Sequence, residues 1–89
     1  MEISRLFGKP KTYKIGGEDF TFKPLELDNI DILIGMEDQT KKAEAIKTLI
    51  ITTFKKSYPD VKEEDIKKIS LEYFEELTKA ILDVHNLKT

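Results

Sequence analysis

The stretch from Leu71 to Leu87 carries its charged side chains on one narrow stripe of a helix. At about 100° per residue, six polar positions share an arc of roughly 100°: Glu72, Glu75, Glu76, Lys79, Asp83 and Asn86. The apolar positions spread over about 220°, more than the arc of about 100° through which a surface helix usually meets its core; they are Leu71, Tyr73, Phe74, Leu77, Ala80, Ile81, Leu82, Val84 and Leu87. Such a helix needs neighbours on two sides. It is either the central element of a small domain or it keeps part of its apolar arc for another chain.

The size and charge of the chain limit its partners. Its 89 residues correspond to one domain, which hides only about 60–65% of the surface of the unfolded chain. The formal net charge is -2, from 15 basic and 17 acidic side chains, so no long-range attraction draws it to a phosphate backbone or an anionic membrane. Arg5 is the only arginine, which removes most bidentate recognition of bases and phosphates. We therefore expect neither a nucleic-acid nor a membrane partner.

The absence of cysteine excludes a disulfide framework, a thiolate zinc site and a cysteine nucleophile. The longest apolar runs, such as 32–34 and 49–51, are far shorter than the roughly 20 residues that a membrane-spanning helix needs. The first ten residues lack the apolar core of a signal peptide. These features predict a cytoplasmic protein.

A β-hairpin is predicted over residues 12–23. Segments 12–15 and 20–23 alternate between apolar and polar residues, and they are separated by Gly16 and Gly17, which supply the positive φ angles of a tight turn. Pro24 ends the second strand because it lacks an amide donor. One face of the hairpin is apolar: Tyr13, Ile15, Phe20 and Phe22. Residues 1–11 are interpreted as an N-terminal arm in which Leu6 and Phe7 form the one apolar pair.

Helices are predicted at about 28–37, 41–57, 61–69 and 71–86, which together with the hairpin form a single α+β domain over residues 12–89. Asp28, Asp60 (with Glu63) and Ser70 have the positions of N-caps. Residues 28–36 leave a third strand as the alternative, because β-branched isoleucines alternate there. The fold class is thus an N-terminal hairpin packed on a bundle of three to four helices.

No motif points to chemistry. The acidic clusters at 63–65 and 72–76 lie where helix N-termini favour negative charge, and they lack the ligand spacing of a calcium loop. His85 has no further metal ligands at a suitable spacing, so it is interpreted as a satisfied or half-exposed histidine. No nucleophile, base and orienting acid can be assembled. We therefore expect no enzyme activity, no catalytic residue, no metal and no cofactor.

The broad apolar arc of the last helix supplies the candidate partner surface. The flank expected to stay exposed for a partner helix or a second copy consists of Tyr73, Leu77, Ala80, Val84 and Leu87. In the alternative, each long helix packs between the hairpin and another helix and no flank remains free.

Three segments carry a family resemblance. Residues 14–27, with the sequence KIGGEDFTFKPLEL, together with Tyr58-Pro59-Asp60-Val61 and Ala80-Ile81-Leu82-Asp83-Val84, resemble the small tail assembly chaperones of long-tailed phages and prophages. The similarity extends from about Thr12 to Leu87, and the arm has no clear counterpart. It lies in apolar and turn patterns, and the family has no single functional residues that can be transferred to this chain.

The resemblance implies a non-enzymatic protein that binds apolar helical segments of the tape measure protein during tail morphogenesis, in the host cytoplasm. Self-association and a frameshifted longer form are left open. Two alternatives remain at this point: a minor tail or connector protein retained in the virion, and a small protein-binding adaptor.

Overall fold

The hairpin forms where the alternating pattern predicts it. In the computed structural model, which describes residues 2–87, β1 (Lys11–Ile15) pairs antiparallel with β2 (Glu18–Phe22), and Tyr13 lies opposite Phe20. Gly16 and Gly17 connect the strands with φ angles of 61° and 82°. These positive values suit a two-residue turn and are readily adopted only by glycine. Met1, Lys88 and Thr89, at the ends of the predicted arm and domain, lie outside the described residues.

Within residues 2–87, four α-helices follow the hairpin and confirm the α+β class: α1 (Ile30–Glu37), α2 (Lys42–Ser57), α3 (Glu63–Ile66) and α4 (Phe74–Val84). Short 3-10 turns precede α1 and α4, at η2 (Leu27–Asn29) and η3 (Leu71–Tyr73). The helical interpretation of 28–37 is confirmed, and the alternative of a third strand is wrong. The helix predicted at 61–69 is shorter than expected, because α3 is a single turn.

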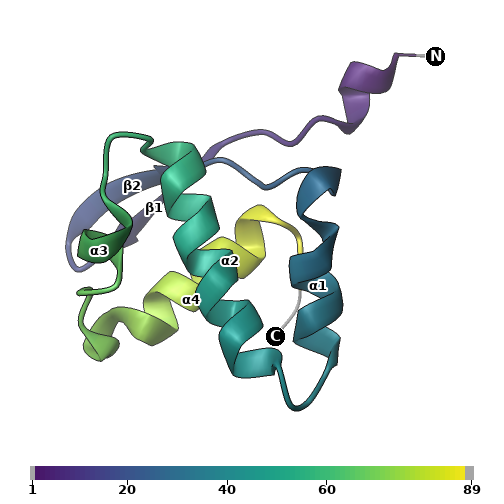
Figure 1. Ribbon diagram of the computed structural model, residues 1–89. Helices are drawn as coiled ribbons and strands as arrows, with labels where there is room; N and C mark the ends of the chain where they lie inside the picture. Colours follow the sequence, from purple (N-terminus) through teal and green to yellow (C-terminus); the bar gives the residue numbers. More distant parts are fainter. Residues whose placement is uncertain (1, 88–89) are drawn as a thin grey trace.

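The centre of the molecule is occupied by α2, which separates α1 from the hairpin and α3 (Figure 1). The helix α4 crosses α2 and also packs against β1, so the core lies where the hairpin, α2 and α4 meet. Aromatic rings fill much of this core. The ring of Phe22, fully buried, lies 5.0 Å from that of Phe54, and Phe20 and Tyr58 complete the cluster. The predicted apolar face of the hairpin is thus directed into the core.

One of the three predicted N-caps is confirmed. The Ser70 hydroxyl accepts a hydrogen bond from the amide of Glu72 at 3.3 Å. Asp28 does not cap α1, because η2 starts one residue earlier and places Asp28 inside the first turn. Asp60 is also wrong as a cap, since the chain leaves the turn after Tyr58 in an extended conformation and α3 begins after Lys62.

Hydrogen bonds fasten both strands of the hairpin to helices. On the free edge of β2, the amide of Thr21 donates to the Tyr58 hydroxyl at 2.8 Å, and the amide of Lys23 donates to Ser57 Oγ at 2.9 Å. On the other strand, the Tyr13 hydroxyl donates to Asp83 on α4. Because an open edge strand would invite pairing with another chain, these contacts make the β2 edge a poor docking site.

The arm leaves the body of the molecule at the start of β1 and contains the 3-10 turn η1 (Ile3–Leu6), coloured purple in Figure 1. Leu6 and Phe7 are mostly exposed. Gly8 crosses closely over Pro24, since a Cβ atom there would lie 2.1 Å from Pro24 Cγ. The arm therefore touches the segment after β2 through a glycine, while its apolar side chains remain accessible.

Candidate docking surfaces

The flank predicted to bind a partner lies in the core of the domain. Leu77, Ala80 and Val84 are buried, with 4%, 5% and 4% of their surfaces exposed, and Tyr73 and Leu87 are partly buried against the same cluster. The expectation that this flank is exposed is therefore wrong.

The reason for this burial is the position of α4. The hairpin covers α4 along one side and α2 covers it along another, so the two neighbours that the broad apolar arc requires are supplied by the same chain. The structure places the five residues together on one side of α4, but they pack inward. A partner could reach Ala80 and Val84 only after the domain had opened.

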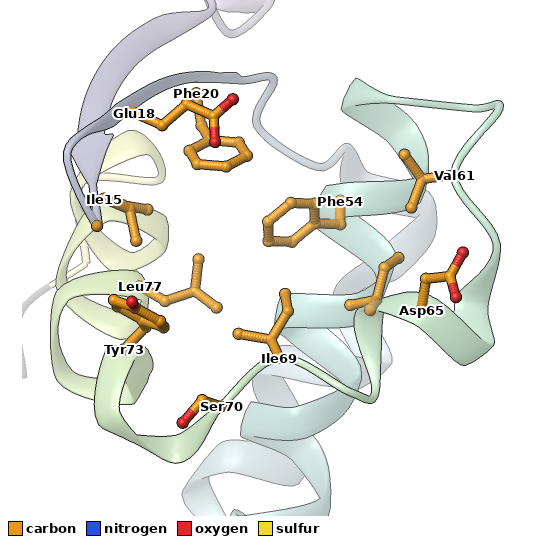
Figure 2. Close-up of a pocket in the computed structure, with 12 residues that line it drawn as sticks. Ile15, Glu18, Phe20, Phe54, Val61, Asp65, Ile69, Ser70, Tyr73 and Leu77 are labelled. Carbon is orange, nitrogen blue, oxygen red and sulfur yellow. The ribbon is translucent and has the colours of Figure 1, made fainter.

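Two of the five residues border a real cavity. Tyr73 and Leu77 line an apolar pocket of about 410 Å³ between the hairpin, α2, α3 and η3. Figure 2 shows its wall of aliphatic and aromatic side chains, including Phe54 and Ile69, and places the carboxylates of Glu18 and Asp65 beside it. The ring of Tyr73 also covers the turn, because a Cβ atom on Gly16 would lie 3.0 Å from Tyr73 Cε1.

A second groove, of about 470 Å³, lies on the other side of the segment from α3 to η3. Ile50, Ile66 and Leu77 are among its walls, and the exposed Leu71 and Phe74 stand at its edge. Lys47 and Lys67 also line this groove, so it carries positive charge beside its apolar surface.

A third apolar surface, the α1 strip, follows the outer side of η2 and α1. We define it as Leu27, Ile30, Leu33 and Ile34, of which Leu27 and Ile34 are 80% and 62% exposed and the other two nearly half exposed. Their spacing of three and four residues is that of one helix face. The strip was not predicted as a site, because the apolar pattern pointed to the last helix instead. The signal that could have revealed it is the number of isoleucines in 30–34, which exceeds what one inner face of a two-turn helix can bury.

The inner side of α1 explains why the strip remains outside. Ile32 is buried, Met36 packs on the core, and Gly35 lets the helix approach α2 so closely that a Cβ atom there would lie 3.2 Å from Ala45 Cβ. These residues, at i, i+3 and i+4, account for the contact between α1 and α2. The strip residues lie away from this contact.

Two hollows adjoin the α1 strip. One, of about 300 Å³, is bounded by Leu27, Ile30 and Leu33 on one side and by His85 and Leu87 on the other. The second, of about 620 Å³, lies beneath the arm and is bounded by Phe7, Pro24 and again Leu27. Since Leu25, Glu26 and Leu27 line both hollows, the apolar surface continues from α1 to the arm.

His85 is satisfied within the fold, as its isolation in the sequence predicts. Its Nε2 accepts a hydrogen bond from the amide of Leu25 at 2.7 Å, because an amide can only donate. The proton is therefore on Nδ1, which donates to the carbonyl oxygen of Ile81 at 2.7 Å. The ring joins α4 to the segment that leads into α1, and both nitrogens are occupied.

The pKa values of Tyr13 and Asp38 differ from their ordinary values because of their surroundings in the fold. Partial burial, and then the hydrogen bond to Asp83 and the charge of that carboxylate, raise the pKa of Tyr13 to about 12. Hydrogen bonds from the hydroxyl and the amide of Thr40 lower the pKa of Asp38 in the α1–α2 loop. Neither group lies in a pocket with a nucleophile or a second acid, so neither arrangement resembles a catalytic site.

Among residues 2–87, no three histidine or acidic side chains gather as ligands of a metal ion would. Within the same range, no helix combines the length and the apolar character needed to cross a bilayer. Comparisons of the chain with protein-family models, with curated proteins and with solved structures gave no match.

Proposed function

We propose that this protein is a non-enzymatic assembly chaperone that shields apolar helical segments of a client protein. The observation that carries the proposal is the α1 strip, where four large apolar side chains lie together on the surface of a small domain and continue into the hollow beneath the arm. Contiguous apolar surface of this kind usually marks a site of protein association. The binding surface in this proposal is therefore α1, in place of the α4 flank.

The resemblance to tail assembly chaperones names the client class. A tape measure protein is long and helical, and before the tail tube surrounds it, its apolar positions are exposed to solvent. An apolar strip beside hollows suits such a client, because side chains from one helix can enter the hollows while the strip covers the rest of its apolar stripe. The binding would take place in the host cytoplasm, and the chaperone would be absent from the finished particle.

Co-expression tests the proposal. The tape measure protein of the same genome is produced with the wild-type chain and, separately, with the double variant Ile30→Ser/Ile34→Ser. We expect a larger soluble fraction of tape measure protein with the wild type than with the variant. The matched control is Leu71→Ser/Phe74→Ser, which removes exposed apolar surface from the other groove and should retain the activity.

Two results would contradict the proposal. One is an unchanged soluble fraction when the wild-type chain is present. The other is detection of this chain by mass spectrometry in purified particles at a fixed stoichiometry, which would indicate a structural tail component.

A further inference from the structure

The segment that carries the α1 strip is acidic. Residues 24–40 contain no lysine or arginine, and they hold five carboxylates: Glu26, Asp28, Asp31, Glu37 and Asp38. The chain as a whole has a net charge of only -2, so residues 24–40 are more acidic than the rest of the chain. The groove beside Leu71 is lined by Lys47 and Lys67, and the hollow beneath the arm is lined by Lys23 and Lys56.

Several of these carboxylates lack a cationic partner in the described part of the chain. Glu26 pairs with Lys56 at 3.2 Å, and Asp38 accepts hydrogen bonds from Thr40. Asp28, Asp31 and Glu37 enter no ion pair with any residue of 2–87. Asp31 and Glu37 lie three residues before and three residues after Ile34, so both are close to the apolar strip.

We propose that the α1 strip selects amphipathic helices whose apolar stripe is flanked by lysine or arginine. This inference rests on the proposed function and narrows the client segment to a chemical class. Leucine-sized side chains of the client enter the hollow between α1 and Leu87, and its cations lie against Asp28, Asp31 and Glu37. Matching charges around an apolar contact improve the association rate and exclude helices with acidic flanks.

Two synthetic helical peptides test the selection. They share one apolar stripe of leucines at i, i+3, i+4 and i+7, and their flanks are lysine in one and glutamate in the other. Fluorescence anisotropy with the full chain should give a dissociation constant at least tenfold lower for the lysine peptide. The preference should shrink as salt is raised from low to physiological concentration, because exposed charges are screened.

Variants locate the binding and its charge dependence. Ile30→Ser/Ile34→Ser should abolish binding of the lysine peptide, whereas Leu71→Ser/Phe74→Ser should leave it within twofold of wild type. Asp31→Lys/Glu37→Lys should reverse the preference toward the glutamate peptide. All six positions are exposed, so circular dichroism and thermal unfolding should confirm that each variant remains folded.

Equal affinity for the two peptides would overturn the inference, as would loss of binding in the Leu71→Ser/Phe74→Ser variant alone. It would also be overturned if neither peptide bound and sedimentation showed a dimer that Leu6→Asp dissociates, since the strip would then be covered by the arm of a second copy. The co-expression assay separates this inference from the proposed function. If the chain keeps tape measure protein soluble but binds both peptides equally, only the inference is refuted. If it prefers the lysine peptide but does not keep tape measure protein soluble, only the chaperone role is refuted.

Discussion

The helices α4 and α1 are both rich in apolar residues, yet one is buried and the other is half exposed. Most of the apolar arc of α4 is enclosed, including Ile81, which is completely buried. In α1, which has only eight residues, Ile32 is buried while Ile34 is mostly exposed. The amphipathic pattern is much stronger in α4, where all charged side chains share one stripe.

The difference shows that the place of a helix in the fold decides whether its apolar face is buried by the same domain. The hairpin and α2 meet α4 on two sides, whereas α1 packs mainly on α2 at the edge of the molecule (Figure 1). A broad arc on a central helix is therefore consistent with a lone domain. An apolar strip on a short edge helix is better evidence for a partner, because no element within residues 2–87 covers it.

The largest difference in the free energy of unfolding is expected between isoleucine-to-alanine substitutions in the two helices. Ile81→Ala should destabilise the protein by about 3 kcal/mol, because it removes a fully buried side chain and leaves a cavity. Ile34→Ala deletes the same atoms from an exposed position and should change the free energy of unfolding by less than about 0.5 kcal/mol. Urea unfolding followed by circular dichroism measures both. Similar losses in the two variants would mean that α1 is covered in solution.

Local backbone chemistry was predictable from the sequence. Gly16-Gly17 marked the hairpin turn because few other residues adopt its φ angles, and Ser70 marked a helix start because its hydroxyl replaces a missing acceptor. The N-caps predicted at Asp28 and Asp60 were wrong because the helical turns begin two residues away from the expected positions, with Glu26 and Lys62 as the actual N-caps. These features depend on neighbours in the sequence.

The docking surface was not predictable in the same way. Burial of Leu77 and Val84 depends on how the hairpin and α2 are placed around α4, and no local pattern specifies that arrangement. The same holds for Leu27, which is 80% exposed although it is a large apolar residue at the start of a helical segment. The sequence therefore indicated that the chain has more apolar residues than its core needs, but it did not indicate which of them are exposed.

The link between the two regions is the ring of His85. His85→Ala should destabilise the protein by about 2 kcal/mol, because the amide of Leu25 and the carbonyl of Ile81 lose their partner in a partly buried position. Urea unfolding gives the total, and faster hydrogen exchange of the Leu25 amide should locate the loss. Lys79→Ala on the exposed side of α4 is the control, since its ion pair with Glu75 is at the surface. Equal effects of both changes would show that the ring does not connect α4 to the segment before α1.

The buried face of α2, which lies between α1 and α4, contains an unpaired polar group. Thr53 is fully buried, and its hydroxyl has no hydrogen-bond partner among residues 2–87. Thr53→Val keeps the shape and removes the unpaired polar group, so we expect stabilisation by about 1 kcal/mol. Thr52→Val, at a position that is only partly buried, should have a smaller effect. Thermal unfolding compares the two, and destabilisation by Thr53→Val would indicate that the hydroxyl has a partner in solution.

The smallest effect concerns the contact of α4 with the hairpin, and it appears only in alkali. Because the pKa of Tyr13 rises to about 12 in the folded state from an ordinary value of 10.0, its contribution to stability is complete below pH 10 and is lost as the pH rises toward 12. Tyr13→Phe removes the hydroxyl that donates to Asp83. The stability difference between wild type and variant should therefore decrease between pH 10 and 12. If the stability difference stays constant from pH 9 to 12, the folded state does not favour the protonated Tyr13 hydroxyl over the ionised one. The hairpin would then be held on α4 by apolar contact and by the hydrogen bond that the Gly16 amide donates to Glu76.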